Sequence, residues 1–149
     1  MNEFLEQLRL VVSSGVEGEQ RARRAAEMIR AARNYRWVGI YHVLEYEIAV
    51  IGWTGDAPAL PRFPRTQGLN GESARTGAPV VVNDVSRDPR YLTTFGSTRS
   101  EMIVPIRSSG GQIRGTIDVE SDRVNAFGED DVRFVEQCAM ALARIFEPD

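Results

Sequence analysis

The stretch that decides the fold is QIRGTIDVES at residues 112–121, together with Glu101 in the apolar segment before it. Small or apolar residues alternate with polar ones along this stretch, and a period of two is typical of a β-strand. Asp118 and Glu120 are two residues apart, so we expect them on the same face of a sheet. The sequence SSGG at 108–111 predicts a turn that folds EMIVPI, which follows Ser100, onto this strand. Three carboxylates are therefore expected to converge on one patch of sheet.

A patch of converging carboxylates repels itself unless a cation, a metal ion or a proton lies there. From the residues alone, three interpretations stay open: recognition of an ammonium group, coordination of a divalent cation by oxygen ligands, and ordinary solvated carboxylates at strand ends. No aspartate-rich loop accompanies Glu101, Asp118 and Glu120, so no metal site is predicted.

Composition places the chain among ordinary globular proteins. Its 149 residues, 42% hydrophobic and 26% charged, predict a single domain over residues 1–149 with a core of its own. The net charge of −3 gives no broad attraction to nucleic acid or to an anionic membrane. All 18 basic residues are arginine, which excludes a Schiff-base lysine and a P-loop. No apolar run reaches the roughly 20 residues of a membrane span, and no signal peptide is visible.

The number of cysteines excludes several kinds of functional site. Cys138 is the only cysteine, so an intramolecular disulfide, a cysteine-rich zinc site and a two-cysteine redox cycle are excluded within one chain. A cytoplasmic protein is expected. Cys138 falls on the apolar seam of a predicted helix, which favours a buried small side chain over a redox sensor.

Hydrophobic periodicity divides the chain into helices and strands. A helical N-terminal segment covers residues 2–33, and Asn70 is a candidate cap for a short central helix. The expected elements are helices at 2–13 and 18–33, strands at 35–43 and 48–53, a helix within 68–79, strands at 79–83, 101–107 and 112–120, and a last helix at 128–146.

Tight turns between neighbouring strands predict an antiparallel sheet with helices on one face, which is an α+β fold. The other face would then be covered by two long connections, 54–78 and 84–100. A space between a sheet and two such connections is a natural site for a small molecule.

The strand YRWVGIYHV places Trp37 and Tyr41 on one face, and Val38 and Ile40 on the other. The two aromatic residues are either a wall of a binding site or part of the core, and the pattern does not separate these roles. His42, the only histidine, alternates with the apolar residues, so we expect a packed or edge residue and no general base. No catalytic triad is recognisable.

The motifs GLNGESARTG, VVVNDV, SEMIVPI, GTIDVES and FGEDD, in this order, resemble a GAF domain from about residue 19 to residue 146. WVGIY, SEMIVPI and GTIDVES, with Gly68 and Gly71, are more narrowly similar to the free methionine-(R)-sulfoxide reductase branch. The resemblance implies a GAF-like, PAS-related antiparallel sheet with the N- and C-terminal helices on one face and a ligand pocket roofed by loops on the other. It also implies a homodimer, a common GAF arrangement.

In the reductase branch, two aromatic residues of the first strand, the glutamate of the SE motif and two acids of the last core strand line the substrate pocket. By motif, the ligand-binding residues implied here are Trp37, Tyr41, Glu101, Asp118 and Glu120. Glu120 departs from the aspartate that the branch carries, and its longer side chain changes the pocket.

A larger departure concerns the cysteines of the reductase branch. By motif, their positions hold Leu60, Asn70 and Thr94 here. Sulfoxide reduction needs a thiolate to attack sulfur and a second thiol to resolve the product, and none of these three side chains is a thiol. The resemblance therefore implies a pocket without its catalyst, and no catalytic residue is predicted.

The leading hypothesis is a stand-alone sensory module, without a cofactor, that binds a small amino-acid or amine-like ligand. The alternatives are an active free methionine-(R)-sulfoxide reductase and a purely structural dimerisation domain. Small helical residues, Ala22, Ala25 and Ala141, are expected to let two copies pack helix to helix. The arginine-rich helix at 18–33 is read as a solvated face, because no aromatic residues interleave, so no nucleic-acid partner is expected.

Overall fold

In the computed structural model, which describes residues 2–14, 17–93 and 96–147, six strands form one antiparallel sheet. The strands are β1 (Trp37–Val43), β2 (Glu47–Thr54), β3 (Arg62–Pro64), β4 (Val80–Val82), β5 (Ser100–Arg107) and β6 (Ile113–Ser121). Their order across the sheet is β3-β2-β1-β6-β5-β4. The two strands that carry the acidic residues, β5 and β6, are therefore neighbours at the centre, and β1 lies on the other side of β6.

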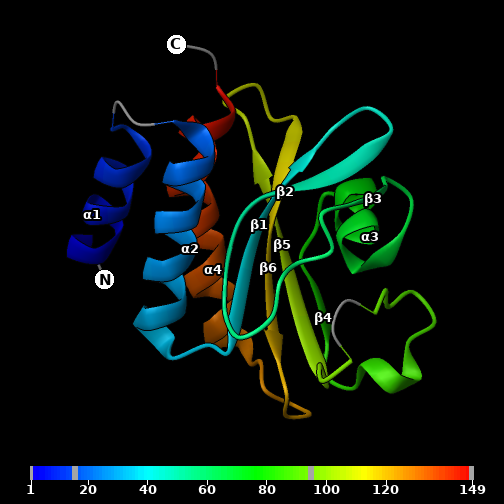
Figure 1. Cartoon of the computed structure of the whole chain (residues 1–149). Helices are drawn as coiled ribbons and strands as arrows, with labels where there is room; N and C mark the ends of the chain where they lie inside the picture. Colours follow the sequence, from blue (N-terminus) through cyan, green and yellow to red (C-terminus); the bar gives the residue numbers. More distant parts are fainter. Residues whose placement is uncertain (1, 15–16, 94–95, 148–149) are drawn as a thin grey trace.

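Four α-helices pack around this sheet: α1 (Asn2–Val12), α2 (Gly18–Arg33), α3 (Gly68–Thr76) and α4 (Glu129–Leu142). Figure 1 shows α1, α2 and α4 together on one side of the sheet, and α3 with the long connections on the other. Two short 3₁₀ turns, η1 (Val85–Arg87) and η2 (Ala143–Phe146), complete the described elements. The α+β architecture is the one that the sequence predicts.

The helix-covered face holds the larger hydrophobic core. Val38 and Ile40 of β1 point into it, together with apolar residues of β5, β6 and the three helices. At Gly52 of β2, a Cβ atom would lie 2.5 Å from the Arg23 backbone nitrogen. Glycine at this position lets α2 approach the sheet closely.

Three alanine side chains that were expected to form a contact between two copies of the chain are instead packed in the core of a single copy. Ala22 and Ala25 are fully buried in the helix-side core, and Ala141 is 3% exposed. The prediction that they form a helix-to-helix contact between copies is wrong, because α2 and α4 turn their small residues toward the chain's own sheet and helices.

Cys138 also lies in the helix-side core, fully buried. Burial raises the pKa of its thiol to about 12, so the thiolate is not formed near neutral pH. His42 is half-buried, and its ring lies 5.2 Å from the ring of Phe146. Both residues have the packing roles that the sequence predicts.

The opposite face of the sheet is covered by the two long connections. Trp37 and Tyr41 pack there with Phe63 of β3. Leu60 from the first connection and Leu92 from the second pack against the same cluster. The expected cover over this face is confirmed, and β3, which the sequence analysis missed, is a three-residue part of it.

The short helix α3 differs from its prediction in one respect. It begins at Gly68 with Gln67 as its N-cap residue, so Asn70 is an interior residue and the capping role predicted for it is wrong. The Asn70 side chain reaches instead to β6, a contact across 46 and 48 positions of sequence that local patterns do not contain. None of the helices in the described part of the chain combines the length and the apolar character needed to cross a bilayer.

Candidate functional site

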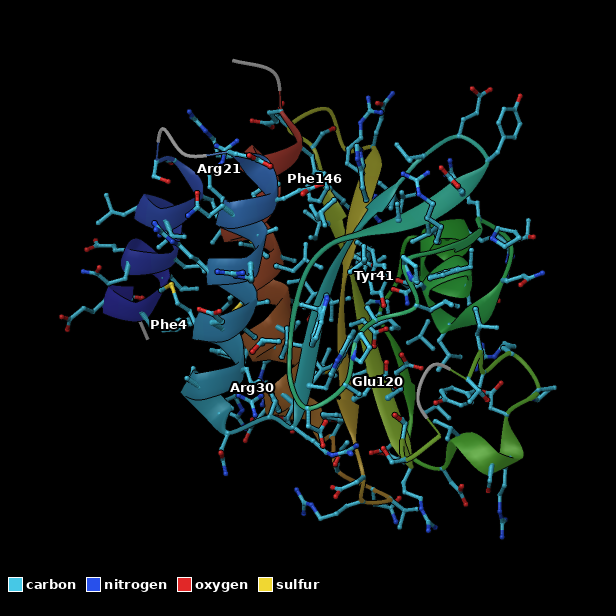
Figure 2. All side chains as sticks on the ribbon, in the orientation of Figure 1. Phe4, Arg21, Arg30, Tyr41, Glu120 and Phe146 are labelled. Carbon is cyan, nitrogen blue, oxygen red and sulfur yellow. The ribbon has the colours of Figure 1, made fainter. Side chains whose placement is uncertain are left out.

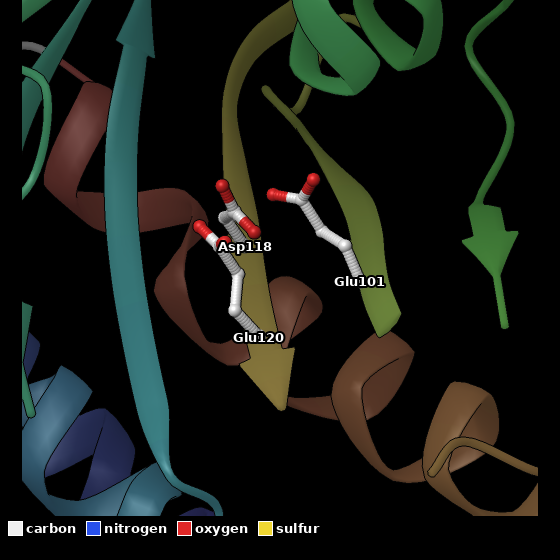
Figure 3. A group of neighbouring side chains, drawn as sticks. All are labelled: Glu101, Asp118 and Glu120. Carbon is white, nitrogen blue, oxygen red and sulfur yellow. The ribbon is translucent and has the colours of Figure 1, made fainter. Parts of the chain in front are cut away.

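The three acidic residues singled out from the sequence meet on the face opposite the helices (Figure 3). Glu101 on β5 is directly opposite Glu120 on β6, and Asp118 lies one pleat further along. One carboxylate oxygen from each residue lies within 4.8 Å of the others. The hairpin between β5 and β6 therefore brings together side chains that are 17 to 19 positions apart in the sequence.

All three carboxyl groups are buried: Glu101 is 5% exposed, and Asp118 and Glu120 are each 1% exposed. Burial, which disfavours the charged form, raises the pKa of Asp118 to about 6. Burial and the Asp118 charge raise the pKa of Glu120 to about 8. Burial, followed by the charges of the other two, raises the pKa of Glu101 well above its usual range. At neutral pH the unliganded cluster therefore keeps protons, and Asp118 carries most of its negative charge.

Neutral donors satisfy only part of this cluster. Asn70 Nδ2 donates to Asp118 Oδ2 at 3.0 Å, and the Thr98 hydroxyl donates to Glu120 Oε1 at 2.7 Å. Asp118 Oδ1 and Glu120 Oε2 are buried. Among the described residues, no N–H group and no alcohol or phenol hydroxyl donates a hydrogen bond to either oxygen. Hydrogen bonds between Glu101 and the other two acids form when one partner is protonated. A proton or a cationic group is needed to complete the site.

The strand beside β6 supplies the aromatic side of the site. Trp37 is paired with Glu120, and Tyr41 is paired with Thr116. Both rings are fully buried. The Trp37 indole N–H donates to the Ala57 carbonyl at 2.9 Å, and the Tyr41 ring meets Phe63 edge-on at 5.7 Å. Burial, with the nearby carboxylates, raises the pKa of Tyr41 well above its usual range.

Gly39 lies between the two aromatic residues on β1 and makes room for them. A Cβ atom at this position would lie 2.4 Å from the Trp37 ring and 3.2 Å from the Tyr41 ring. The absence of a side chain allows both rings to lie over the strand beside the carboxylates. The five residues implied by the motif resemblance are thus brought together on one face of the sheet.

None of the positions that the motif resemblance assigns to the reductase cysteines carries a thiol. Leu60 packs against the aromatic cluster, and Asn70 binds Asp118 and Thr116. Thr94 lies outside the described residues. Cys138 is in the core on the helix side of the sheet, which separates it from the carboxylates.

Sequence reasoning missed the partners that orient the acidic residues. Thr98 belongs to the second connection and Asn70 to α3, and both reach Glu120 or Asp118 only after folding. The Thr116 hydroxyl, which donates to Asn70 Oδ1 at 2.6 Å, shares a face with Asp118 by its period-two spacing. That spacing was the one signal that could have found a member of this set.

A divalent cation fits this set of residues poorly. Three carboxylates supply between three and six oxygen ligands, whereas calcium takes 6–8 and magnesium usually keeps several waters, so water ligands would be needed as well. The Asn70 oxygen already accepts the Thr116 hydroxyl, and the side toward β1 is made of buried aromatic rings. The surroundings suit a cation that carries its own hydrogen-bond donors and has an apolar part.

Comparison with known proteins shows the family of the chain. The family model described as GAF domain matches residues 17–146. The chain belongs to the GAF domain family. GAF domain-containing protein A of Dictyostelium discoideum is 30% identical over 110 residues, which cover 73% of this chain and 68% of that protein.

Two further relatives of this GAF domain are named as reductases. The free methionine-R-sulfoxide reductase of Saccharomyces cerevisiae is 29% identical over 113 residues, covering 74% of this chain and 63% of that protein. The X-ray structure of free methionine-R-sulfoxide reductase from Neisseria meningitidis, in complex with its substrate, aligns with a TM-score of 0.86. That enzyme is 28% identical, and the alignment covers 97% of this chain and 87% of the enzyme.

Proposed function

We propose that this GAF domain is a sensory module that binds a small molecule carrying an ammonium group, such as an amino acid or an amine. The ligand would lie against Trp37 and Tyr41 with its ammonium group on Glu101, Asp118 and Glu120. The observation that carries the proposal is the cluster of three buried carboxyl groups, two of which have oxygens without a neutral donor.

An ammonium group has three N–H donors and one positive charge, and the cluster offers three carboxyl groups around one point. Each hydrogen bond to a charged group contributes about 1.5–3 kcal/mol where water is excluded. Trp37 and Tyr41 lie on the neighbouring strand, paired with Glu120 and Thr116, and an aromatic face turned toward the ammonium group would attract it further. The charge, the donor number and the apolar surroundings all favour an organic ammonium over a hydrated metal ion.

We propose a non-catalytic role because the chain lacks the pair of thiols that sulfoxide reduction requires. Reduction of a sulfoxide by thiols removes one oxygen as water and forms one disulfide, so it consumes two thiols. The chain has one cysteine. Its thiol is buried on the other side of the sheet, and burial raises its pKa.

The proposal is tested by calorimetry and thermal shift with a panel of amino acids, methionine sulfoxides, amines and nucleotides. We expect at least one ammonium-bearing compound to bind, and Asp118→Asn to lower its affinity by about 30-fold or more, because a buried charge partner is lost. Asp130→Asn, at an exposed position of α4, is the matched control and should leave the affinity unchanged.

The same titration reports on the protons of the cluster. A cationic ligand favours ionised carboxyl groups, so binding at pH 7 should release protons, and the measured enthalpy should differ between PIPES and Tris buffers. Binding that is confined to neutral or anionic compounds, or that persists in Asp118→Asn, would contradict an ammonium site.

Catalysis is the second candidate, favoured by the similarity to the Neisseria meningitidis and yeast reductases. We expect purified protein with dithiothreitol or thioredoxin to show no steady consumption of free methionine-(R)-sulfoxide. Steady turnover that Glu101→Ala abolishes would replace the sensory proposal with a reductase. A homodimer, which a purely structural role would require, stays a prediction to be measured by light scattering.

A further inference from the structure

A cavity of about 940 Å³ lies at one end of the sheet, apart from the aromatic rings of the proposed ammonium site. It is lined by the end of α2, the start of β1, and the end of β6 with the turn that leads into α4. Figure 1 shows these segments meeting at the same end of the molecule, and Figure 2 labels Arg30 there on α2. We refer to it as the strand-end cavity.

The lining of the strand-end cavity is rich in guanidinium groups. It holds four arginines, Arg30, Arg33, Arg36 and Arg123, and three acidic residues, Glu120, Asp122 and Asp131. The chain as a whole has a net charge of −3, so a cavity with more arginines than acids is a local reversal of charge.

The acidic residues of the cavity either have hydrogen-bond and ion-pair partners within the protein or are largely protonated. Asp131 Oδ1 accepts from Arg33 Nε at 3.0 Å and from the Tyr35 hydroxyl at 2.7 Å, and Asp131 Oδ2 accepts from the Gly128 N–H at 3.0 Å. Burial acts to raise the pKa of Asp131, but these hydrogen bonds and the Arg33 charge hold it below its usual value. Glu120 keeps its proton near neutral pH because burial raises its pKa to about 8.

Asp122 faces Arg36, whose Nε lies 3.8 Å from Asp122 Oδ2. Arg36 Nη2 also donates to Asp56 Oδ2 at 3.1 Å and to the Ser97 hydroxyl at 2.8 Å. Asp122 therefore has Arg36 as a cationic partner, which it shares with Asp56, and Asp131 has Arg33.

Two arginines of the lining have no acidic partner among the described residues. Among the residues that the structure describes, Arg30 and Arg123 have no carboxylate within the 4.0 Å of an ion pair. Arg30 Nε donates to the Arg36 carbonyl at 3.1 Å, which orients the guanidinium group and leaves its terminal nitrogens for another acceptor. A guanidinium group binds phosphate oxygens with two parallel hydrogen bonds.

We propose that the strand-end cavity binds a phosphate group through Arg30 and Arg123, as a second ligand site of this protein. The volume lies within the range of about 300–1,000 Å³ that small-molecule sites occupy, which leaves room for an organic phosphate. Asn34, Tyr35 and Phe127 are among the uncharged residues of the lining. This site goes beyond the proposed ammonium site. The two sites share Glu120 as a lining residue, whereas Arg30 and Arg123, which would hold the phosphate, belong to the strand-end cavity alone.

The test uses calorimetry and thermal unfolding of the full chain with inorganic phosphate and with ribose 5-phosphate. Sodium chloride at matched ionic strength is the reference. At ten times the dissociation constant we expect phosphate to raise the midpoint temperature by about 3 °C or more above the chloride reference. Tighter binding of ribose 5-phosphate identifies an organic phosphate as the ligand, and equal binding identifies free phosphate.

The double variant Arg30→Gln/Arg123→Gln should weaken phosphate binding at least about tenfold, with two charge-assisted contacts removed. Arg9→Gln/Arg24→Gln, at exposed positions of α1 and α2, makes the same charge change elsewhere and should retain binding. Circular dichroism establishes that both variants fold.

An effect of phosphate no larger than that of chloride would overturn the proposal, as would equal losses in the two double variants, which indicate a general charge effect. The Arg30→Gln/Arg123→Gln variant should still bind the ammonium ligand. Failure of the phosphate site is thereby distinguished from failure of the ammonium site, which Asp118→Asn reports.

Discussion

Between pH 5 and pH 8, the free energy of unfolding of the unliganded protein is expected to fall by at least about 4 kcal/mol. The reason is that Glu101 and Glu120 have pKa values raised by burial in the folded state, whereas both ionise near pH 4 in the unfolded chain. The folded state then binds more protons, so stability is lost as pH rises toward the folded pKa. One carboxyl group that stays protonated across most of these three pH units, as Glu120 does, contributes about 1.4 kcal/mol per unit and so accounts for about 4 kcal/mol by itself. Glu101 adds to the loss in the same direction, and so does Asp118 between pH 5 and its folded pKa of about 6.

The measurement is chemical denaturation at half-unit pH steps, with midpoint temperatures as a second readout. Glu120→Gln is the matched variant, since its neutral amide has nearly the shape of the protonated acid. At pH 8 we expect Glu120→Gln to be more stable than the parent protein, and its loss of stability with rising pH to be smaller.

His42 acts in the opposite direction and must be separated from the carboxyl groups. Burial, with the Arg114 charge, lowers the pKa of His42, so its contribution to stability rises with pH up to about 6.5. The range from pH 7 to pH 8 therefore reports on the carboxyl groups. A flat or rising profile in that range would show that the cluster is ionised in the unliganded protein.

The variant Asn70→Leu is expected to destabilise the unliganded protein by about 3–5 kcal/mol. Asn70 is 5% exposed and is the neutral donor to Asp118 Oδ2 as well as the acceptor of the Thr116 hydroxyl. Leucine has a similar size but satisfies neither group, and each buried polar group left unpaired costs about 1–3 kcal/mol. Removing a donor that stabilises the ionised form should also raise the pKa of Asp118.

Thr116→Val provides the comparison, since it removes the hydroxyl and leaves the amide contact with Asp118 intact. We expect it to cost about 1–2 kcal/mol in the free energy of unfolding. In the double variant, Asn70→Leu/Thr116→Val, the cost should be less than the sum of the two, because both partners of one hydrogen bond are gone. Additive costs would indicate that the two side chains do not share a bond.

Most of the secondary structure could be read from the sequence because its signals are local. The alternation of QIRGTIDVES and YRWVGIYHV predicted two neighbouring strands of the sheet, β6 and β1, and the helical periods predicted α1, α2 and α4 within a few residues. One strand was missed, β3, which has three residues. The helix α3 was predicted, but its cap was not, because it begins two residues before Asn70. Three residues carry too little periodicity to separate a strand from a loop.

The sequence by itself determined which side chains share a face and which chemistry is missing. Asp118 and Glu120 had to point the same way because their spacing is two, and one cysteine cannot supply two thiols. Only the tertiary structure decided that Glu101 lies opposite Glu120, that all three carboxyl groups are buried, and that Asn70 and Thr98 donate to them.

The strand-end cavity was likewise decided by the tertiary structure. Arg30 and Arg123 are separated by more than 90 positions of sequence, and both line the cavity where α2 ends and β6 leads into α4. The physical reason for the division is that periodicity is a property of neighbouring residues, whereas register, burial and the resulting pKa shifts depend on how distant segments pack.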